Sequence, residues 1–398
     1  MNDCTQTAKR RAVLRPEARE APESGIVEVF NYGRNRPGLI PLWVGEGDLP
    51  TPGFIAEAAS RSLAAGETFY TYQRGVPELR EALARYHERT YSGSFSPERF
   101  FVTGGGMQAI QIATRMVAGT GDNVVIPGPC WPNITAAVGI AGARAVTVPL
   151  AFGNAGWTLD LDRFFDAVTE RTTALFINSP ANPTGWTASR SDLMAIADFA
   201  EKRGLWIIAD EVYNRFFYDG YRAASFYDFV DRDSPILFVN TFSKNYAMTG
   251  WRIGWLSAPP ALGQTIENLI QYSTSGVAAF MQRAATVALD DGDAFLDEQV
   301  TRARRGRAIV CDGLAATGKV RLAEPSGAFY LFFAIGDETD ARRLALRLVD
   351  EANVGLAPGT AFGDDSGFFR LCFARKEDDL TEAVRRLSEW ISRRFGSS

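Results

Sequence analysis

Residues that could bind a phosphate, form a Schiff base or hold a charged ring nitrogen follow five short apolar segments of the sequence. Each segment runs directly into Gly, Pro, Asn, Asp or Ser, which is typical of a strand that ends in a loop. The residues that follow are Gly105, Gly106 and Met107 after FFVT, Trp131 after NVVI, Asn182 after TALFI, Asp210 and Tyr213 after LWIIA, and Ser243 and Lys244 after PILFVN.

The elements that would position these residues alternate between strand-like and helix-like patterns from Phe54 to about Asp290. This alternation predicts an α/β fold with a mixed, mostly parallel sheet that helices cover on both faces. Ligands bind at the carboxyl ends of such strands, because loop backbones and helix N-termini converge there. We therefore expect the polar residues to share one edge. Seven strands are predicted, in ERFFVTG, DNVVIPG, ARAVTVPL, TALFINS, LWIIADE, PILFVNT and RIGWLSA, and helices are predicted over 107–119, 133–142, 160–169 and 189–203.

A phosphate would fit at the start of the first of these helices. The backbone N–H groups of Gly105, Gly106 and Met107 would hold it, because the N-terminus of a helix attracts anions. Ser243 and Arg252 could add a hydroxyl and a guanidinium donor. Taken alone, a Gly-Gly-Gly turn is more often only a tight turn.

A flat ring attached to that phosphate would meet the remaining residues. Trp131 could stack on the ring, and Asp210 could hold a protonated ring nitrogen. Asn182 and Tyr213 could donate to a ring oxygen. Lys244 could form a Schiff base with a ring aldehyde, as desolvated lysines do. Each residue alone has a simpler structural explanation, but together they match pyridoxal 5′-phosphate.

These motifs also carry a family resemblance. From about Ile26 to about Trp390 the sequence resembles the class I/II aminotransferases of the fold-type-I pyridoxal-phosphate enzymes, especially the bacterial aspartate and aromatic aminotransferases. Its most specific part is SK followed by MTGWRIG. The segments that carry it are GEGDLPTP, FYTYQRGVPELREA, VTGGGMQAI, PGPCWP, NSPANPTG, ADEVYNRFFY, SKNYAMTGWRIGW, PSGAFY, APGTAFG and FRLCFA.

The resemblance implies a role for each matched residue. It makes Lys244, Asp210 and Tyr213 catalytic, and it assigns the cofactor to the residues named above. It adds Arg370 as the clamp of the substrate α-carboxylate, with the Gly45 backbone, Trp131 and Asn182 beside it. Tyr70 would reach the cofactor phosphate of a neighbouring subunit, which implies a homodimer with shared sites.

The reaction implied is ping-pong transfer of an amino group from an L-amino acid to a 2-oxo acid, with 2-oxoglutarate expected as the acceptor. Lys244 would act as the general base. A lyase, decarboxylase or oxidase reaction on the same fold stays open, because the reaction depends on the substrate pocket. A sensor domain of a transcription factor is disfavoured, since only about 25 polar residues precede the matched region.

Several positions near the expected substrate pocket depart from the family pattern. Gly47 and Leu49 stand where Pro and Phe are usual, and Tyr72 stands where many relatives have Pro. Met107 occupies a position at which some relatives that use acidic substrates have Lys. Ile134 replaces a histidine of the aspartate branch. The amino donor is therefore open between acidic, aromatic and other amino acids.

Chain length and the pattern of apolar and polar residues predict the domain organisation. At roughly 100–200 residues per domain, 398 residues suggest two to four domains, or one large domain with a smaller partner. We expect a flexible N-terminal arm over 1–25, a large cofactor-binding domain over 48–290, and a smaller α+β domain formed by 26–47 with 291–398.

Composition excludes several classes of protein. Charged residues are 22% of the chain and the net charge is −5, so nucleic acid is not expected as a partner. A single histidine, His87, leaves too few ligands for the usual zinc sites, no metal is expected, and we expect this side chain to be exposed or to cap a helix. Four scattered cysteines favour a reducing cytoplasm, and neither a signal peptide nor a membrane span is expected.

Overall fold

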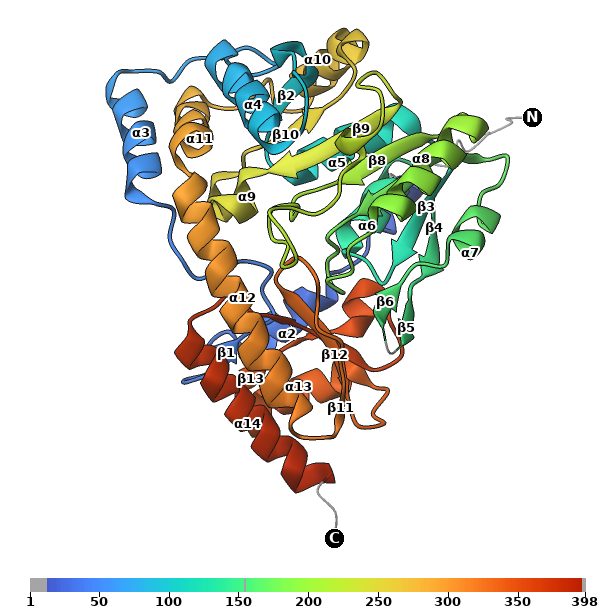
Figure 1. Ribbon diagram of the computed structural model, residues 1–398, viewed down its shortest axis with the longest axis vertical. Helices are drawn as coiled ribbons and strands as arrows, with labels where there is room; N and C mark the ends of the chain where they lie inside the picture. The colour runs from blue at the N-terminus through green and yellow to red at the C-terminus, as the bar shows by residue number, and fades with distance from the viewer. Residues whose placement is uncertain (1–12, 154, 396–398) are drawn as a thin grey trace, which may run out of the picture.

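The centre of the computed structural model, which describes residues 13–153 and 155–395, is a seven-stranded mixed sheet (Figure 1). The strand order is β2-β10-β9-β8-β7-β3-β4, and β10 runs antiparallel to both of its neighbours. All seven predicted strands are present, so the predicted α/β sheet is confirmed. Their bounds are β2 Phe100–Thr103, β3 Asn123–Gly128, β4 Arg144–Pro149, β7 Thr172–Asn178, β8 Trp206–Asp210, β9 Ile236–Thr241 and β10 Gly254–Ser257.

The ends of these strands lie in register along one edge of the sheet. Asn178 pairs with Asp210 across β7 and β8. Gly254, the first residue of the antiparallel β10, pairs with Thr241 on one side and with Thr103 on the other. The loops that follow β2, β7, β8 and β9 therefore leave the sheet side by side, as the sequence predicts.

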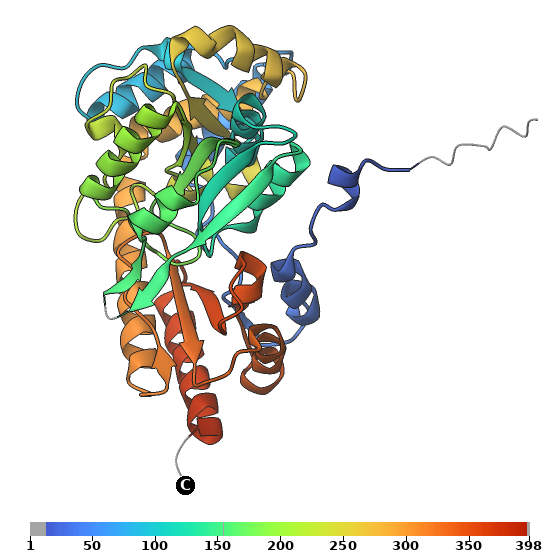
Figure 2. The same ribbon diagram turned by 90° about the vertical axis from the view of Figure 1, so that its right-hand side faces the viewer.

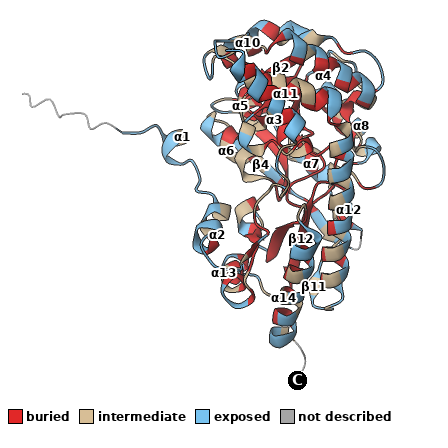
Figure 3. Cartoon of the chain, turned by 90° about the vertical axis from the view of Figure 1, so that its left-hand side faces the viewer, coloured by how far each residue is buried: buried red, intermediate tan, exposed pale blue. Residues whose placement is uncertain are grey.

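Helices surround the large sheet and a smaller four-stranded sheet, and Figure 3 shows exposed residues on the outer surfaces of the helices and mostly buried strands. The four helices predicted between the strands are present as α5, α6, α7 and α8. The helices are α1 Pro16–Arg19, α2 Gly25–Gly33, α3 Gly53–Ala64, α4 Pro77–Thr90, α5 Gly106–Val117, α6 Pro132–Ile140, α7 Leu161–Asp166, α8 Arg190–Arg203, α9 Phe242–Asn245, α10 Gly263–Gln271, α11 Ala279–Asp291, α12 Asp293–Ala315, α13 Ala341–Ala352 and α14 Glu377–Phe395.

Both faces of the large sheet are buried, each in its own hydrophobic cluster. On β3, Val125 belongs to the cluster that includes α3, α4, α8 and α11, whereas Val124 and Ile126 belong to the cluster that includes α5, α6 and α10. Successive residues of a strand point to opposite faces, so a sheet covered on both sides has near-continuous apolar strands. This explains the uninterrupted apolar runs in the sequence.

A third hydrophobic cluster lies around a smaller antiparallel sheet of order β11-β12-β15-β14, at the lower end of Figure 1. Helices α12, α13 and α14 pack on it, and α2 contributes Val29. Two further two-stranded pairs join β1 to β13 and β5 to β6. The bounds are β1 Ile40–Pro41, β5 Ala151–Gly153, β6 Gly156–Thr158, β11 Val320–Arg321, β12 Tyr330–Ile335, β13 Val354–Gly355, β14 Ala357–Pro358 and β15 Phe368–Cys372.

Residues 13–24, which include α1, extend to one side of the molecule in Figure 2. Helix α1 has no buried residue. Of the arm predicted over 1–25, residues 1–12 lie outside the described part of the chain, and the division into domains stays a prediction. Within the described ranges no helix has the length and apolar character needed to span a membrane, and no group of three His, Cys, Asp or Glu side chains could hold a metal ion.

The prediction of an exposed or capping His87 is wrong, because its side chain is 2% exposed. It lies four residues after Leu83 on the buried face of α4, among aromatic rings that include Phe100, 4.5 Å away between ring centroids. Its Nδ1 donates to the Leu83 carbonyl at 2.8 Å, and burial lowers its pKa to about 3. His87 is therefore a neutral core residue.

Candidate active site

A cavity of about 530 Å³ opens at the carboxyl edge of the large sheet, and residues of the small sheet complete its wall. All predicted site residues line it except Gly105 and Tyr70. The predicted residues that line it are Gly45, Gly106, Met107, Trp131, Asn182, Asp210, Tyr213, Ser243, Lys244, Arg252 and Arg370.

The start of α5 forms one end of this cavity. Gly105 is the N-cap residue, and no side chain caps the helix there. Its φ of 83° is rarely adopted by other residues, and a Cβ atom would lie 2.7 Å from Nη2 of Arg252. Glycine at this position thus lets a guanidinium approach uncapped N–H groups, an arrangement of donors that could bind an anion.

Arg252 and Ser243 face this end from the segment after β9. Arg252 has a φ of 53°, a left-handed conformation that costs a non-glycine residue roughly 1–2 kcal/mol. Its Nη1 donates to the Thr249 carbonyl at 2.8 Å, which fixes the guanidinium. The Ser243 hydroxyl accepts from Thr241 Oγ1 at 2.9 Å, so its own proton stays available to a ligand.

Asp210 lies at the end of β8 and is 4% exposed. One of its oxygens accepts the Val212 N–H at 3.3 Å. Burial raises the pKa of Asp210 to about 7, and the nearby Lys244 charge opposes this rise. A cationic ligand group at this carboxylate would stabilise its charged form.

Asn182 links the two sides of the cavity. Its backbone N–H donates to Asn178 Oδ1 at 2.9 Å, and its side-chain Oδ1 accepts Nη1 of Arg370 at 3.0 Å. The same guanidinium donates through Nη2 to the Trp43 carbonyl. Because Oδ1 faces the arginine, the Nδ2 donor of Asn182 is free to meet a ligand oxygen.

Arg370 comes from β15 of the small sheet and is buried. Its guanidinium lies 4.7 Å from the ring centroids of both Tyr330 and Phe362, which favours a cation by cation–π attraction. Its buried Nε atom has no partner among the described residues. A planar guanidinium held in this way is suited to bind a carboxylate with two hydrogen bonds.

Lys244 and Tyr330 both donate to the Gly45 carbonyl, and Tyr213 is hydrogen-bonded to Tyr330. Lys244 Nζ donates to that oxygen at 2.6 Å, and the Tyr330 hydroxyl donates to it at 3.2 Å. The hydroxyls of Tyr213 and Tyr330 share a hydrogen bond of 2.8 Å, and burial raises the pKa of Tyr213, which keeps it neutral. A Cβ atom on Gly45 would lie 2.8 Å from the Tyr330 hydroxyl, so this close approach requires glycine.

Burial lowers the pKa of Lys244 to about 8, and the charges of Arg370 and Arg252 act in the same direction. A substantial fraction of the amine is therefore neutral near physiological pH. A buried amine of this kind can act as a nucleophile or a base.

Two residues of the cavity that hydrogen-bond to predicted site residues have no role of their own in the sequence-based prediction. Tyr330 and Asn178 hold Tyr213 and Asn182, respectively. Both lie in segments that carry the family resemblance, PSGAFY and NSPANPTG, and these motifs are the sequence signal that could have identified them. Which residue of each motif would point into the cavity depends on the strand register, and the sequence did not reveal it.

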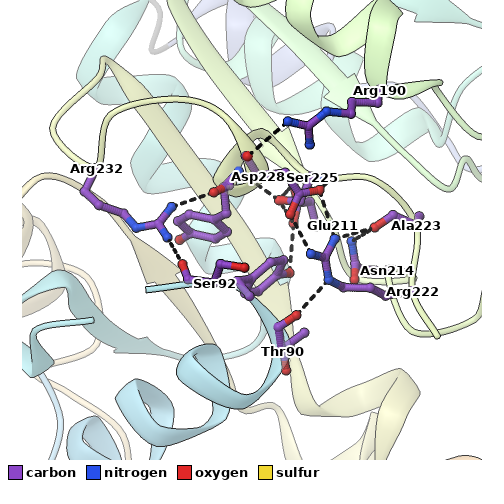
Figure 4. Close-up of polar contacts among 12 residues, drawn as sticks. Thr90, Ser92, Arg190, Glu211, Asn214, Arg222, Ala223, Ser225, Asp228 and Arg232 are labelled. Atoms are coloured by element: carbon purple, nitrogen blue, oxygen red, sulfur yellow. Dashed lines mark hydrogen bonds and ion pairs between the residues drawn. The ribbon is translucent and has the colours of Figure 1, made fainter. Parts of the chain in front are cut away.

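A polar network that includes the buried Glu211, the residue after Asp210, is shown in Figure 4. The Glu211 carboxylate accepts the Ser225 hydroxyl at 2.7 and 2.9 Å and the Tyr91 hydroxyl at 3.2 Å. The Ser225 N–H donates to Asp228, which also pairs with Arg222. Burial raises the pKa of Glu211 to about 7. The network anchors the segment that carries Tyr213.

Tyr70 is not brought to this cavity. Its side chain is 92% exposed and borders a separate surface groove formed by 68–71 and 274–278. Arg34, Arg36 and Arg74 do not line the cavity either. Arg36 pairs with Asp350, and Arg74 pairs with Glu98 and Glu267.

Comparisons with known proteins agree with this arrangement. The family described as aminotransferase class I and II matches residues 37–387. A probable aspartate/prephenate aminotransferase of Aquifex aeolicus is 36% identical over 358 residues, which are 88% of this chain and 90% of that protein. A single mutant of the Thermus thermophilus aspartate aminotransferase superposes with a TM-score of 0.89 at 33% identity, over 95% of this chain and 100% of that one.

The structure of an aromatic aminotransferase from Pyrococcus horikoshii is also similar, with a TM-score of 0.85 at 33% identity over 93% of this chain and 100% of that one. The chain belongs to the class I and II aminotransferase family and has its fold-type-I architecture. It is an enzyme that transfers an amino group, with amino acids and keto acids as substrates.

Proposed function

We propose that this enzyme uses pyridoxal 5′-phosphate to move an amino group from an L-amino acid to 2-oxoglutarate. The observation that carries the proposal is that a buried lysine, a buried aspartate and an uncapped helix N-terminus border one cavity. The hydrogen-bond donors and charges of the cavity fit this cofactor. The Gly105 cradle beside Arg252 suits a phosphate, Asp210 suits a ring cation, and the Nδ2 atom of Asn182 suits a ring oxygen.

When bound, the cofactor supplies a conjugated sink for the electrons left when the substrate Cα loses its proton. Asp210 would hold the ring nitrogen in its protonated form. Arg370 would bind the substrate α-carboxylate, and Asn182 would keep that arginine aligned with the ring. Trp131 would limit water and stack on the ring.

Lys244 is the proposed base, because its amine is buried in the cavity and His87, the only histidine, lies outside it. Its Nζ would take the proton from the substrate Cα and return it on the cofactor side of the substrate nitrogen, two bonds away. One water molecule then supplies the carbonyl oxygen with which the first amino acid leaves as its 2-oxo acid, and the amino group stays at the site until the second half-reaction, which releases the water again. A second 2-oxo acid takes up that group, so no external oxidant or reductant is needed.

A homodimer is part of the proposal. Tyr70 and its neighbours Phe69 and Tyr72 are strongly exposed apolar side chains, which a partner subunit would cover. In that arrangement Tyr70 would reach the phosphate of the partner's cofactor. We also propose a cytoplasmic location, which the unpaired thiols of Cys130, Cys311 and Cys372 support.

The test is the absorption spectrum of the purified holoenzyme during addition of single amino acids without an oxo acid. We expect the cofactor band to convert to the amino form and to return on addition of 2-oxoglutarate. Lys244→Ala should abolish this cycle. Release of ammonia, carbon dioxide or hydrogen peroxide in place of the reversible cycle would instead support a lyase, decarboxylase or oxidase.

A further inference from the structure

Part of the cavity wall is apolar. Ile26, Val27 and Phe30 of α2 line it together with Met107 and Ile110 of α5. Ile26 and Phe30 are four residues apart and so share one face of their helix. Val27 and Phe30 are exposed although both are large and apolar.

Three basic side chains line the cavity within the described ranges, and each is already held by a contact or assigned to another ligand group. Lys244 donates to the Gly45 carbonyl, and Arg252 lies against Gly105 at the anion site. Arg370 is fixed by Asn182 and Trp43. The acidic side chains that line the cavity, Asp210 and Glu46, would repel a second carboxylate of a substrate.

A further cation in the described surroundings, Arg302 of the neighbouring pocket that shares Ser243 and Lys244, is paired with Asp48. In the proposed dimer the partner would add the surface next to Tyr70. The groove beside that tyrosine is lined by neutral residues of 68–71 and 274–278. Arg74, the nearest arginine in sequence, is held by Glu98 and Glu267.

We infer that the amino donor carries an apolar side chain, aliphatic or aromatic, and not a second carboxylate. The inference rests on the proposed function, since Arg370 must take the α-carboxylate for the side chain to meet this wall. A carboxylate buried against Ile26, Phe30 and Met107 would lose its water without gaining a cation, which is costly. An apolar group there gains free energy in proportion to the area that it buries.

The first experiment compares the rate of the amino-acid half-reaction of the holoenzyme with L-leucine, L-phenylalanine, L-aspartate and L-glutamate. Full burial of a leucine or phenylalanine side chain corresponds to a factor of roughly 10 to 150. We therefore expect kcat/KM for the two apolar amino acids to exceed that for the acidic ones by about this factor.

A matched pair of variants tests the wall itself. Met107→Lys places a cation in the wall, and it should lower the ratio of leucine to aspartate in kcat/KM by roughly tenfold or more. Met107→Leu keeps the site apolar at similar volume and should leave that ratio within about threefold. An unchanged ratio in Met107→Lys would overturn the inference, because the substrate side chain would then lie elsewhere.

Equilibrium binding separates this inference from the proposed reaction. The dissociation constants of 3-phenylpropionate and succinate, which cannot react, are measured by calorimetry on the holoenzyme. We expect 3-phenylpropionate to bind at least about tenfold more tightly. If no amino acid gives a half-reaction while 3-phenylpropionate still binds more tightly than succinate, transamination is refuted and the inference about the side chain stands. Tighter binding of succinate, or faster reaction of aspartate, glutamate or an amide such as asparagine than of leucine, would overturn the inference and leave transamination in place.

Discussion

Replacing Arg370 by lysine is expected to lower kcat/KM for amino acids by roughly 10- to 150-fold. The guanidinium uses one nitrogen for Asn182 and one for the Trp43 carbonyl, and its Nε atom has no partner among the described residues. The edge of the guanidinium that includes Nε is therefore available to a carboxylate. A lysine amine is a single point charge and cannot hold its two neighbours and both carboxylate oxygens at once.

The magnitude follows from the hydrogen bond that is lost. A hydrogen bond to a charged group contributes about 1.5–3 kcal/mol, and about 1.4 kcal/mol corresponds to a tenfold change in rate. Arg370→Lys keeps one such bond and the positive charge, so one bond is the expected loss. Removal of the donor to Asn182 Oδ1 would add to the effect by letting the Asn182 amide turn.

The assay is the single-turnover rate against amino-acid concentration, followed by the cofactor absorption. Arg99→Lys is the matched control, because Arg99 is equally buried but precedes β2 at the opposite edge of the sheet, where it pairs with Asp233. This control should keep kcat/KM within about twofold. A rate for Arg370→Lys within twofold of wild type, or an equal loss in Arg99→Lys, would refute the proposed clamp.

Three further predictions concern the buried ionisable groups. The rate at which cofactor-free protein reacts with pyridoxal phosphate should rise with pH through about 8, the lowered pKa of Lys244, since the neutral amine is the nucleophile; a flat profile from pH 6 to 9.5 would contradict this. Asp210→Asn should weaken cofactor binding by roughly tenfold or more and slow the half-reaction, because the ring cation loses its counter-charge; unchanged affinity and rate would exclude this role. Burial raises the folded-state pKa of Glu211 to about 7, so its contribution to stability is complete below the unfolded-state value near 4.5 and is lost as pH rises through 7. Wild type should therefore lose about 2 kcal/mol more than Glu211→Gln between pH 5 and 7 in urea unfolding, and equal pH slopes would argue against this origin.

Much of the fold was predictable because the local signals agree with each other. The segments LWIIADE and TALFINS form β8 and β7, and the polar residues after them line the cavity. The start of α8 was equally clear, since Ser189 caps the helix and forms a capping box with Asp192. At such positions the chain has one favourable local structure.

The errors and omissions come from tertiary structure. Histidine is a polar residue type, but His87 lies on the same helix face as Leu79 and Leu83. A neutral imidazole with one hydrogen-bonded nitrogen can be buried there. Tyr330 points at Gly45 only because β12 pairs with β15 in one register. Tyr70 does not reach the cavity of its own subunit, so its proposed role depends on the dimer.

The apolar wall also bears on how the substrate range of this enzyme can evolve. Helix α2 exposes Val27 and Phe30, so these side chains can change at little cost in folding stability. The groups proposed to act on the cofactor come from the loops after β7, β8 and β9, which two different hydrophobic clusters support. Point mutations in one surface helix can therefore change which amino acids are accepted while the reaction itself is inherited intact.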